Sequence, residues 1–231
     1  MIELEAIRKR ARQDLVVATD TGLEDVHLWE HSLRVTEAAQ QIARLPEVAS
    51  GPVDNVVITV AGLYHDAGWV TQVTDGDTTR EAIRCKPTSP LQRELGATMM
   101  EQCLAGMLPG KTLAAASACI RAIGDRDVDI LEAQLIAEAD NLDAFGALSL
   151  WRLARKHVIE GRGLEAAFET WETQERYGYW TARINDSFRF HAVKRIAHQR
   201  LKTFARMIGE LRSEYHGEDL LAVLAATSAS A

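Results

Sequence analysis

The sequence predicts an all-α fold, and three observations support this prediction. Alternating apolar and polar positions, which mark half-buried strands, are scarce. Residues that favour helices, such as Ala, Leu, Glu and Arg, are frequent. Apolar residues also recur at helical spacing in several blocks. The expected helices cover residues 2–17, 24–44, 54–67, 91–106, 111–123, 129–158, 163–173 and 184–213.

Composition and charge exclude several classes of protein. The 231 residues carry a net charge of −7, which disfavours a nucleic-acid-coating or membrane-surface protein. The three cysteines lack metal-ligand spacing, and the N-terminus lacks the layout of a signal peptide. No apolar run approaches the roughly 20 residues that span a bilayer. We therefore expect a cytoplasmic protein with neither a membrane nor a nucleic acid as partner, and homo-oligomer formation stays open.

Residues 70–90 combine Gly, Pro, Thr and Asp without sustained periodicity. This composition predicts a long surface connection between helices. Because the segment follows His65 and Asp66 closely, it is either a lid over a site or a passive linker, and both interpretations stay open.

His31 lies on the apolar face of a predicted helix. Leu28, Val35, Ala38 and Ile42 follow helical spacing, and His31 falls three residues after the first and four before the second. The imidazole is therefore expected to point inward. A single inward histidine is more often a hydrogen-bonded core residue than a metal ligand, so His31 indicates a site only if partners come from elsewhere in the chain.

The next helix ends in His65 and Asp66, directly after a nearly unbroken apolar run from Val56 to Tyr64. A buried carboxylate is costly unless it is paired, hydrogen-bonded or bound to a cation. Gly68 marks the expected end of the helix, where the chain opens into the long connection. Something must therefore compensate the burial of Asp66.

Two acids interrupt the apolar stripe of a third helix. Asp140 and Asp143 share one face with Ile136 and Ala147, at spacings of four, three and four residues. We interpret Asp143 as a hydrogen-bonding group. Three separate helices thus carry metal-capable residues at apolar positions. Two imidazoles with two carboxylates suit Mn²⁺, Fe²⁺, Co²⁺, Ni²⁺ or Zn²⁺.

In chain order, His31, the doublet His65-Asp66 and Asp140 resemble the H…HD…D signature of the HD-domain metal-dependent phosphohydrolases. The flanking segments EHSLRV, VAGLYHDAG, RELGA and ADNLDAFGAL are similar as well. The stretch NDSFRFHAVKRIAHQRLKTFARMIGEL is similar to the closing helices of small stand-alone bacterial members. The resemblance implies an HD-domain-like helical bundle, with one divalent metal held by these four residues. It also implies hydrolysis of phosphomonoesters or phosphodiesters, often of nucleotides.

The resemblance also implies a domain organisation. We expect a single HD-like helical domain over residues 1–215, with its metal-binding core at 20–158 and closing helices at 159–215. Residues 216–231 are expected to form a C-terminal tail. All four residues of the signature fall inside the expected core.

The segment that would bind a second metal departs from the family pattern. Gln92 and Gly124 stand where members with two metals carry histidines, which argues against a second ion. Asp125 could add a carboxylate there, but an aspartate in this turn is more simply a cap for the next helix.

Trp69 is a further departure. Single-metal nucleotidases of the family carry an acidic residue three positions after the doublet, and that residue helps to activate water. Either another acid, Asp75 or Asp77, takes that task, or the activity differs or is weak.

We therefore expect a metal-dependent phosphohydrolase that directs a metal-activated water at a phosphomonoester or phosphodiester of a small metabolite, in particular a nucleotide. The expected catalytic residues are Asp66 and His65. One alternative is an HD-type nucleotide-binding or regulatory module with weakened catalysis, and another is a helical interaction protein. Each candidate phosphate-binding cation could instead be a solvated surface side chain. These candidates are Arg34, Arg80, Arg84, Lys86 and Arg126.

Overall fold

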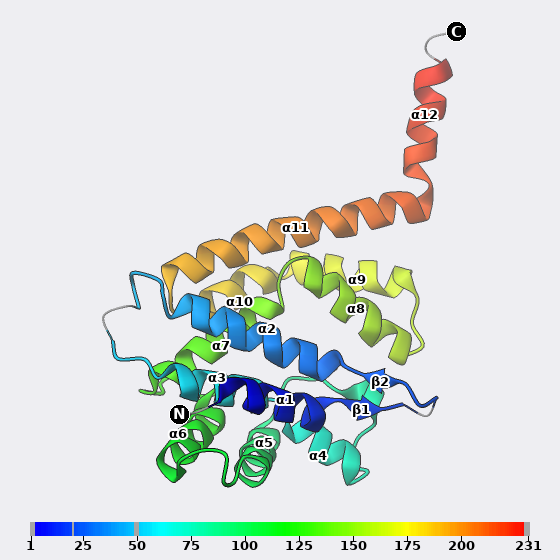
Figure 1. Cartoon of the computed structure of the whole chain (residues 1–231). Helices are drawn as coiled ribbons and strands as arrows, with labels where there is room; N and C mark the ends of the chain where they lie inside the picture. Colours follow the sequence, from blue (N-terminus) through cyan, green and yellow to red (C-terminus); the bar gives the residue numbers. More distant parts are fainter. Residues whose placement is uncertain (1–2, 20, 49–50, 229–231) are drawn as a thin grey trace. The chain divides into compact units, whose positions relative to one another are not determined.

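The all-α fold class is confirmed by the computed structural model, which describes residues 3–19, 21–48 and 51–228 (Figure 1). The chain forms two compact units, Met1–Asp143 and Ala144–Ala231. Within the described residues, the strands are limited to β1 (Val17–Ala18) and β2 (Glu24–Asp25), which pair antiparallel with Val17 opposite Asp25. The boundary between the units falls inside the expected core at 20–158.

The first unit is built from helices that pack around one buried helix. In chain order they are α1 (Leu4–Leu15), α2 (His27–Ile42), α3 (Asn55–Tyr64), α4 (Gly68–Thr74), the 3₁₀ turn η1 (Arg80–Ala82), α5 (Pro90–Cys103), α6 (Gly110–Ala122) and α7 (Leu131–Asp143). The buried helix is α3, which contacts α1, α2, α5, α6 and α7. Its residues from Val57 to Tyr64 are all buried, which explains the unbroken apolar run in the sequence.

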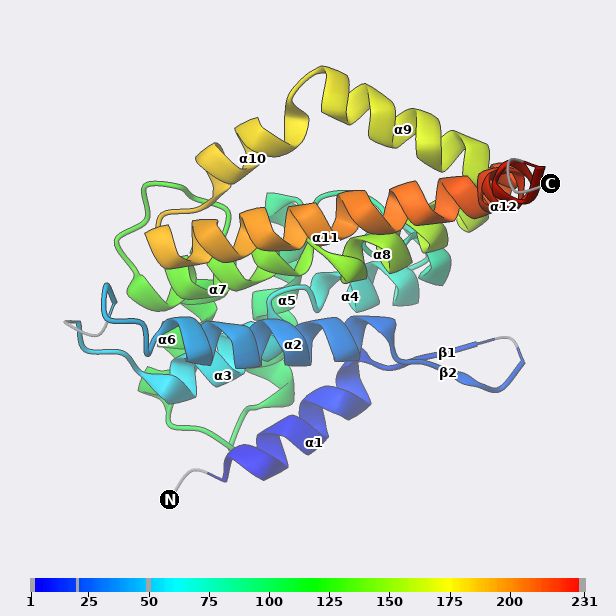
Figure 2. The ribbon, with the colours of Figure 1, turned by 90° about the horizontal axis from the view of Figure 1, so that it is seen from above.

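Local sequence signals begin α3 and bring it close to α2. The Asp54 side chain caps α3 by accepting hydrogen bonds from the backbone N–H of Val56 and Val57, at 2.8 and 3.2 Å. Gly62 lies against Thr36 of α2, and a Cβ at this glycine would approach Thr36 Oγ1 to 2.6 Å. The missing side chain therefore allows the close pairing of the two helices, which Figure 2 shows from above.

The segment 70–90 contains more regular structure than the sequence indicated. Helix α4 extends to Thr74 and η1 lies inside the segment that was predicted to be a long surface connection. The prediction that Gly68 marks the end of a helix is wrong, because Gly68 is the first residue of α4. Ser89 then begins α5 with a capping box, in which its side chain accepts from the Gln92 N–H and the Gln92 side chain accepts from the Ser89 N–H. The irregular parts of this segment are residues 75–79 and 83–89.

The second unit contains α8 (Ala147–Ile159), α9 (Leu164–Arg176), α10 (Tyr179–Ser187), α11 (His191–His216) and α12 (Glu218–Ser228). Aromatic side chains form part of its core. Trp180 packs edge-on against Phe145 and Phe204, with ring centroids 5.4 and 5.7 Å apart. Helix α12 lies within the expected tail 216–231, where leucines such as Leu220 and Leu224 are exposed. Residues 229–231 of that tail lie outside the described residues.

The predicted helix at 129–158 is wrong, because two helices replace it. Helix α7 ends at Asp143 and α8 begins at Ala147. Between them Gly146 adopts a φ of +86°, a left-handed conformation that glycine accepts without steric cost. The apolar pattern continues on both sides of this break, so periodicity alone did not reveal it.

A search of the described helices finds none that is both long enough and apolar enough to cross a membrane.

Candidate metal centre

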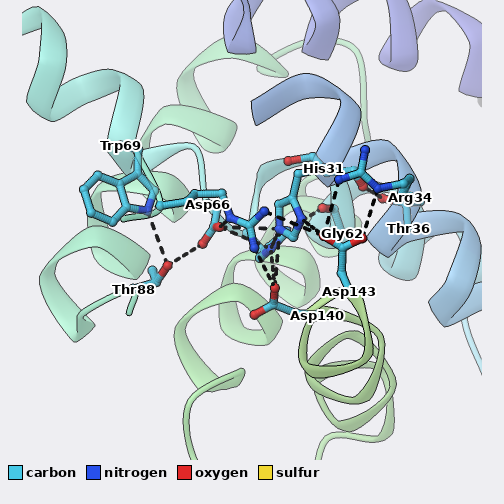
Figure 3. A network of polar contacts seen from close by, with 12 residues as sticks. His31, Arg34, Thr36, Gly62, Asp66, Trp69, Thr88, Asp140 and Asp143 are labelled. Atoms are coloured by element: carbon cyan, nitrogen blue, oxygen red, sulfur yellow. Dashed lines mark hydrogen bonds and ion pairs between the residues drawn. The ribbon is translucent and has the colours of Figure 1, made fainter. Parts of the chain in front are cut away.

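Three elements of the first unit bring the four signature residues together. His31 lies on the inner face of α2 and is fully buried. His65 and Asp66 directly follow the last residue of α3, and each is only 2% exposed. Asp140 comes from α7, and its side chain is one-third exposed. Figure 3 shows His31, Asp66 and Asp140 turned toward one another.

Two imidazole nitrogens and two carboxylate oxygens converge in this cluster. His31 Nε2 lies 3.1 Å from His65 Nε2. Asp66 Oδ2 lies 3.5 and 3.6 Å from these two nitrogens, and Asp140 Oδ1 lies 3.4 and 4.0 Å from them. Metal–ligand bonds of about 2 Å place two ligands of one ion no more than about 4 Å apart, and these five distances meet that limit. Asp140 nevertheless lies outside the group whose ligand atoms are all within 4.8 Å of one another, which consists of His31, His65 and Asp66.

The hydrogen bonds behind the imidazoles determine which nitrogen of each neutral ring carries the proton. His65 Nδ1 lies 2.8 Å from the Gly62 carbonyl oxygen, which can only accept, so Nδ1–H donates. His31 Nδ1 donates in the same way to Asp143 Oδ2, also at 2.8 Å. When both rings are neutral, the two Nε2 atoms, 3.1 Å apart, present lone pairs to each other. Two facing lone pairs beside two carboxylate oxygens fit a divalent cation.

Electrostatics keep His31 neutral and Asp143 ionised. Burial, followed by the nearby positive charge of Arg84, lowers the pKa of His31 well below its usual value. Burial of the Asp143 carboxyl, taken alone, raises its pKa. Hydrogen bonds and charges from His31 and Arg34 nevertheless lower the Asp143 pKa overall. Arg34 Nε and one terminal nitrogen contact the two Asp143 oxygens at 3.0 and 3.3 Å. Asp143 thus lies behind His31 and orients it, as the hydrogen-bonding interpretation predicts.

Asp66 is held by a short hydrogen-bonded chain. Thr88 Oγ1 donates to Asp66 Oδ1 at 2.7 Å, which directs the other oxygen toward the imidazoles. Trp69 Nε1 donates in turn to Thr88 Oγ1 at 3.4 Å (Figure 3). Trp69 is only 4% exposed. At the position where an acid was expected, the chain therefore carries a buried aromatic side chain that helps to hold Thr88.

Arg84 is the cation that sequence reasoning did not single out. Its Nε lies 3.1 Å from Asp66 Oδ2, and one terminal nitrogen lies 3.4 Å from Asp140 Oδ1. The other terminal nitrogen lies 3.8 Å from Asp143 Oδ2, and the side chain is only 6% exposed. The sequence placed Arg84 among several loop cations, and no local pattern distinguished it, because only the course of the loop brings it to the cluster.

The remaining phosphate-binding candidates differ in their surroundings. Arg34 reaches the cluster through Asp143. Arg80 instead pairs with Asp25, at 3.3 Å, and with its neighbour Glu81. Lys86 and Arg126 are exposed. Their role in substrate binding stays a prediction.

The positions at which family members with two metals carry further histidines make other interactions in this chain. The Gln92 side-chain amide donates to Gln72 Oε1 at 2.9 Å. A Cβ at Gly124 would overlap the Arg93 guanidinium. Asp125 Oδ1 accepts from the Asp127 N–H at 2.9 Å, so it stabilises its own turn rather than capping α7. Within the described part of the chain, His31, His65 and Asp66 form the one group of three close, buried metal-capable residues.

Comparisons with known proteins identify the family of the domain that contains these residues. The family model named HD domain matches residues 28–144, just over half of the chain, and this range contains all four signature residues. No curated protein matches the sequence.

Solved structures share the fold. Bacillus subtilis YpgQ is 20% identical, with a TM-score of 0.56 over 91% of this chain and 94% of that chain. The same protein in complex with ADP gives a TM-score of 0.57 at 20% identity, over 92% and 97%. A predicted HD superfamily hydrolase from an uncultured Thermotogales bacterium gives 0.55 at 19% identity, over 92% of each chain. Taken with the shared fold, the family match leads to one conclusion: the chain belongs to the HD-domain family.

Proposed function

We propose that this protein is a phosphohydrolase that uses one divalent transition metal, held by His31, His65, Asp66 and Asp140. The observation that carries the proposal is the pair of facing Nε2 atoms, 3.1 Å apart, between two carboxylates. With both rings neutral, neither Nε2 donates to the other, and a cation between them would satisfy both lone pairs. Mn²⁺, Fe²⁺, Co²⁺, Ni²⁺ and Zn²⁺ all suit such a mixed set of ligands.

When bound, a divalent ion lowers the pKa of a coordinated water and neutralises charge on phosphoryl oxygens. The residues of the chain supply the positioning. Asp143 and the Gly62 carbonyl hold the two imidazoles, and Thr88 holds Asp66. His65 and Asp66 are therefore proposed as catalytic residues, because as ligands they would hold the ion that activates the water, and both are nearly closed to solvent. Asp140 is partly exposed, which leaves one side of the cluster open to a substrate.

The proposed substrate is a phosphomonoester or phosphodiester of a small metabolite, in particular of a nucleotide. Two observations support a phosphorylated ligand. Arg84 and Arg34 add positive charge directly beside the carboxylates, and guanidinium groups pair well with phosphate oxygens. The Bacillus subtilis protein of the same fold has been solved with ADP. The chain itself has an overall charge of −7, so any attraction for a phosphate must come from such local cations.

A substrate screen with matched variants tests the proposal. We expect the Mn²⁺-loaded protein to release phosphate or a nucleoside monophosphate from at least one member of a panel of nucleotides, cyclic dinucleotides and sugar phosphates. Asp66→Ala should lose bound metal and hydrolysis together. The control Asp186→Asn, an exposed acid on α10, should keep both. If the metal-loaded protein hydrolyses no member of the panel, the enzymatic proposal fails.

A second candidate function is a nucleotide-binding or regulatory module with weakened catalysis. The observation in its favour is Trp69, whose indole N–H is directed to Thr88 where a water-activating acid was expected. This candidate predicts that a nucleotide raises the melting temperature of the metal-loaded protein without being turned over. Turnover that a chelator abolishes would exclude it.

A further inference from the structure

Arg84 contacts the same two oxygen atoms that complete the proposed metal site. Asp66 Oδ2 lies 3.5 and 3.6 Å from the imidazole Nε2 atoms, and Arg84 Nε lies 3.1 Å from that same oxygen. Asp140 Oδ1 likewise lies 3.4 Å both from His31 Nε2 and from an Arg84 terminal nitrogen. The guanidinium therefore occupies the acidic side of the cluster.

Two further observations show that Arg84 is held in place by the carboxylates. The residue has a φ of +61°, a left-handed conformation that is unfavourable for a side chain with a Cβ and persists only when its surroundings impose it. Its side chain is 6% exposed, yet one terminal nitrogen is buried without a hydrogen-bond partner in the described structure. The guanidinium thus remains at the cluster mainly through its charge, and not through a complete set of hydrogen bonds.

We propose that the Arg84 guanidinium and a divalent ion compete for Asp66 Oδ2 and Asp140 Oδ1, so that binding of the ion releases Arg84 from the cluster. A divalent ion on these oxygens would lie within a few ångströms of the guanidinium, and the repulsion between like charges in a buried site disfavours simultaneous binding. The arginine supplies the positive charge that the carboxylates need before the ion binds. This inference rests on the metal site of the proposed function.

Competition has a direct consequence for metal affinity. If Arg84 occupies the two carboxylates in most molecules, only the remaining molecules can bind the ion. The apparent affinity for the ion then falls in proportion to the fraction of molecules in which the carboxylates are free. Removing the guanidinium should therefore tighten metal binding, although the residue lies beside the ligands. A residue that merely supported the ligands would have the opposite effect when removed.

The first experiment is a calorimetric titration of the chelator-treated, metal-free protein with Mn²⁺. We expect Arg84→Ala to bind Mn²⁺ about tenfold more tightly than the wild type. Arg84→Gln removes the charge but keeps hydrogen-bonding capacity, so its Mn²⁺ affinity should rise by the same factor. This second variant keeps the experiment decisive if Arg84→Ala folds poorly. The control is Arg121→Ala, which removes an exposed arginine that pairs with Glu94 in the same unit and should leave the affinity unchanged.

The second experiment reports release of the side chain itself. Trypsin cleaves after arginine only when the side chain is accessible, and Arg84 is buried. We expect Mn²⁺ to accelerate cleavage of the wild-type Arg84–Cys85 bond without accelerating cleavage after Arg121. Equal or weaker Mn²⁺ affinity in both Arg84 variants, or Mn²⁺ protection of the Arg84–Cys85 bond, would overturn the competition while leaving the metal site intact. If neither the wild type nor the Arg84 variants bind Mn²⁺, both the competition and the proposed function fail.

Discussion

Buried histidines occur in both units of the molecule, but their surroundings differ. In Met1–Asp143, His31 and His65 each donate from Nδ1 to an oxygen and direct Nε2 at the other ring. In Ala144–Ala231, His157 of α8 is 4% exposed, yet neither of its ring nitrogens has a hydrogen-bond partner among the described residues. Burial of an imidazole therefore does not mark a site. What marks one is an acceptor behind the ring and acidic groups in front of it.

The largest expected difference between the two environments concerns metal content. His65→Ala removes a proposed ligand, so the purified protein should lose its Mn²⁺, as measured by elemental analysis after dialysis. His157→Ala removes an equally buried imidazole without those partners and should keep the metal content of the wild type. Equal loss in both variants would mean that general destabilisation, and not ligand loss, releases the ion.

A smaller effect is expected from the acceptor behind His31. Asp143→Asn keeps the shape of the side chain but removes the charge that orients His31 Nδ1–H. Groups in this position typically contribute 10- to 100-fold to metal affinity, so we expect Mn²⁺ affinity to fall by about that factor. Calorimetric titration measures the change, with Asp186→Asn as the exposed control. An unchanged affinity would show that Asp143 has only a structural role.

The smallest expected effect is a difference in the pH dependence of stability. Burial, followed by the charge of Arg162, lowers the pKa of His157. The unfolded chain therefore takes up a proton near pH 6.5 while the folded chain does not, and the free energy of unfolding falls as the pH drops below that value. His157→Leu removes this contribution. Its stability relative to the wild type should rise by at most about 1.4 kcal/mol per pH unit below pH 6.5.

Urea unfolding at pH 7.5, 6.5 and 5.5 measures this difference. His198→Leu, which replaces an exposed histidine on α11, serves as the control and should follow the wild type. If wild type and His157→Leu lose stability in parallel, His157 takes up its proton as easily in the folded as in the unfolded chain. Its burial would then have no electrostatic consequence.

Helix prediction from periodicity succeeded where one face is continuously apolar and failed where the chain turns inside an apolar pattern. The predicted helix around His31 corresponds to α2, and the apolar run before His65 corresponds to α3. The predicted helix 129–158 missed the break at Gly146, because a positive φ leaves no mark on the spacing of apolar residues. The predicted helix 184–213 is wrong in the same way, because α10 ends at Ser187 and α11 begins at His191. The short helix α4 and the strands β1 and β2 were not predicted either.

By itself, the sequence determined the class of fold, the inward position of His31 and the likeness of the four signature residues to one family. Helical periodicity carries the first two, because a residue's place on a helix face depends only on local spacing, whereas the likeness rests on the order of the four residues and the segments that flank them. Only the tertiary structure decided that His31 and His65 lie 3.1 Å apart and that Arg84, among several loop cations, reaches the carboxylates. These distances join residues far apart in the chain. They depend on how closely the helices pack, as at Gly62 and Thr36, and on the course of a loop that no local pattern specifies.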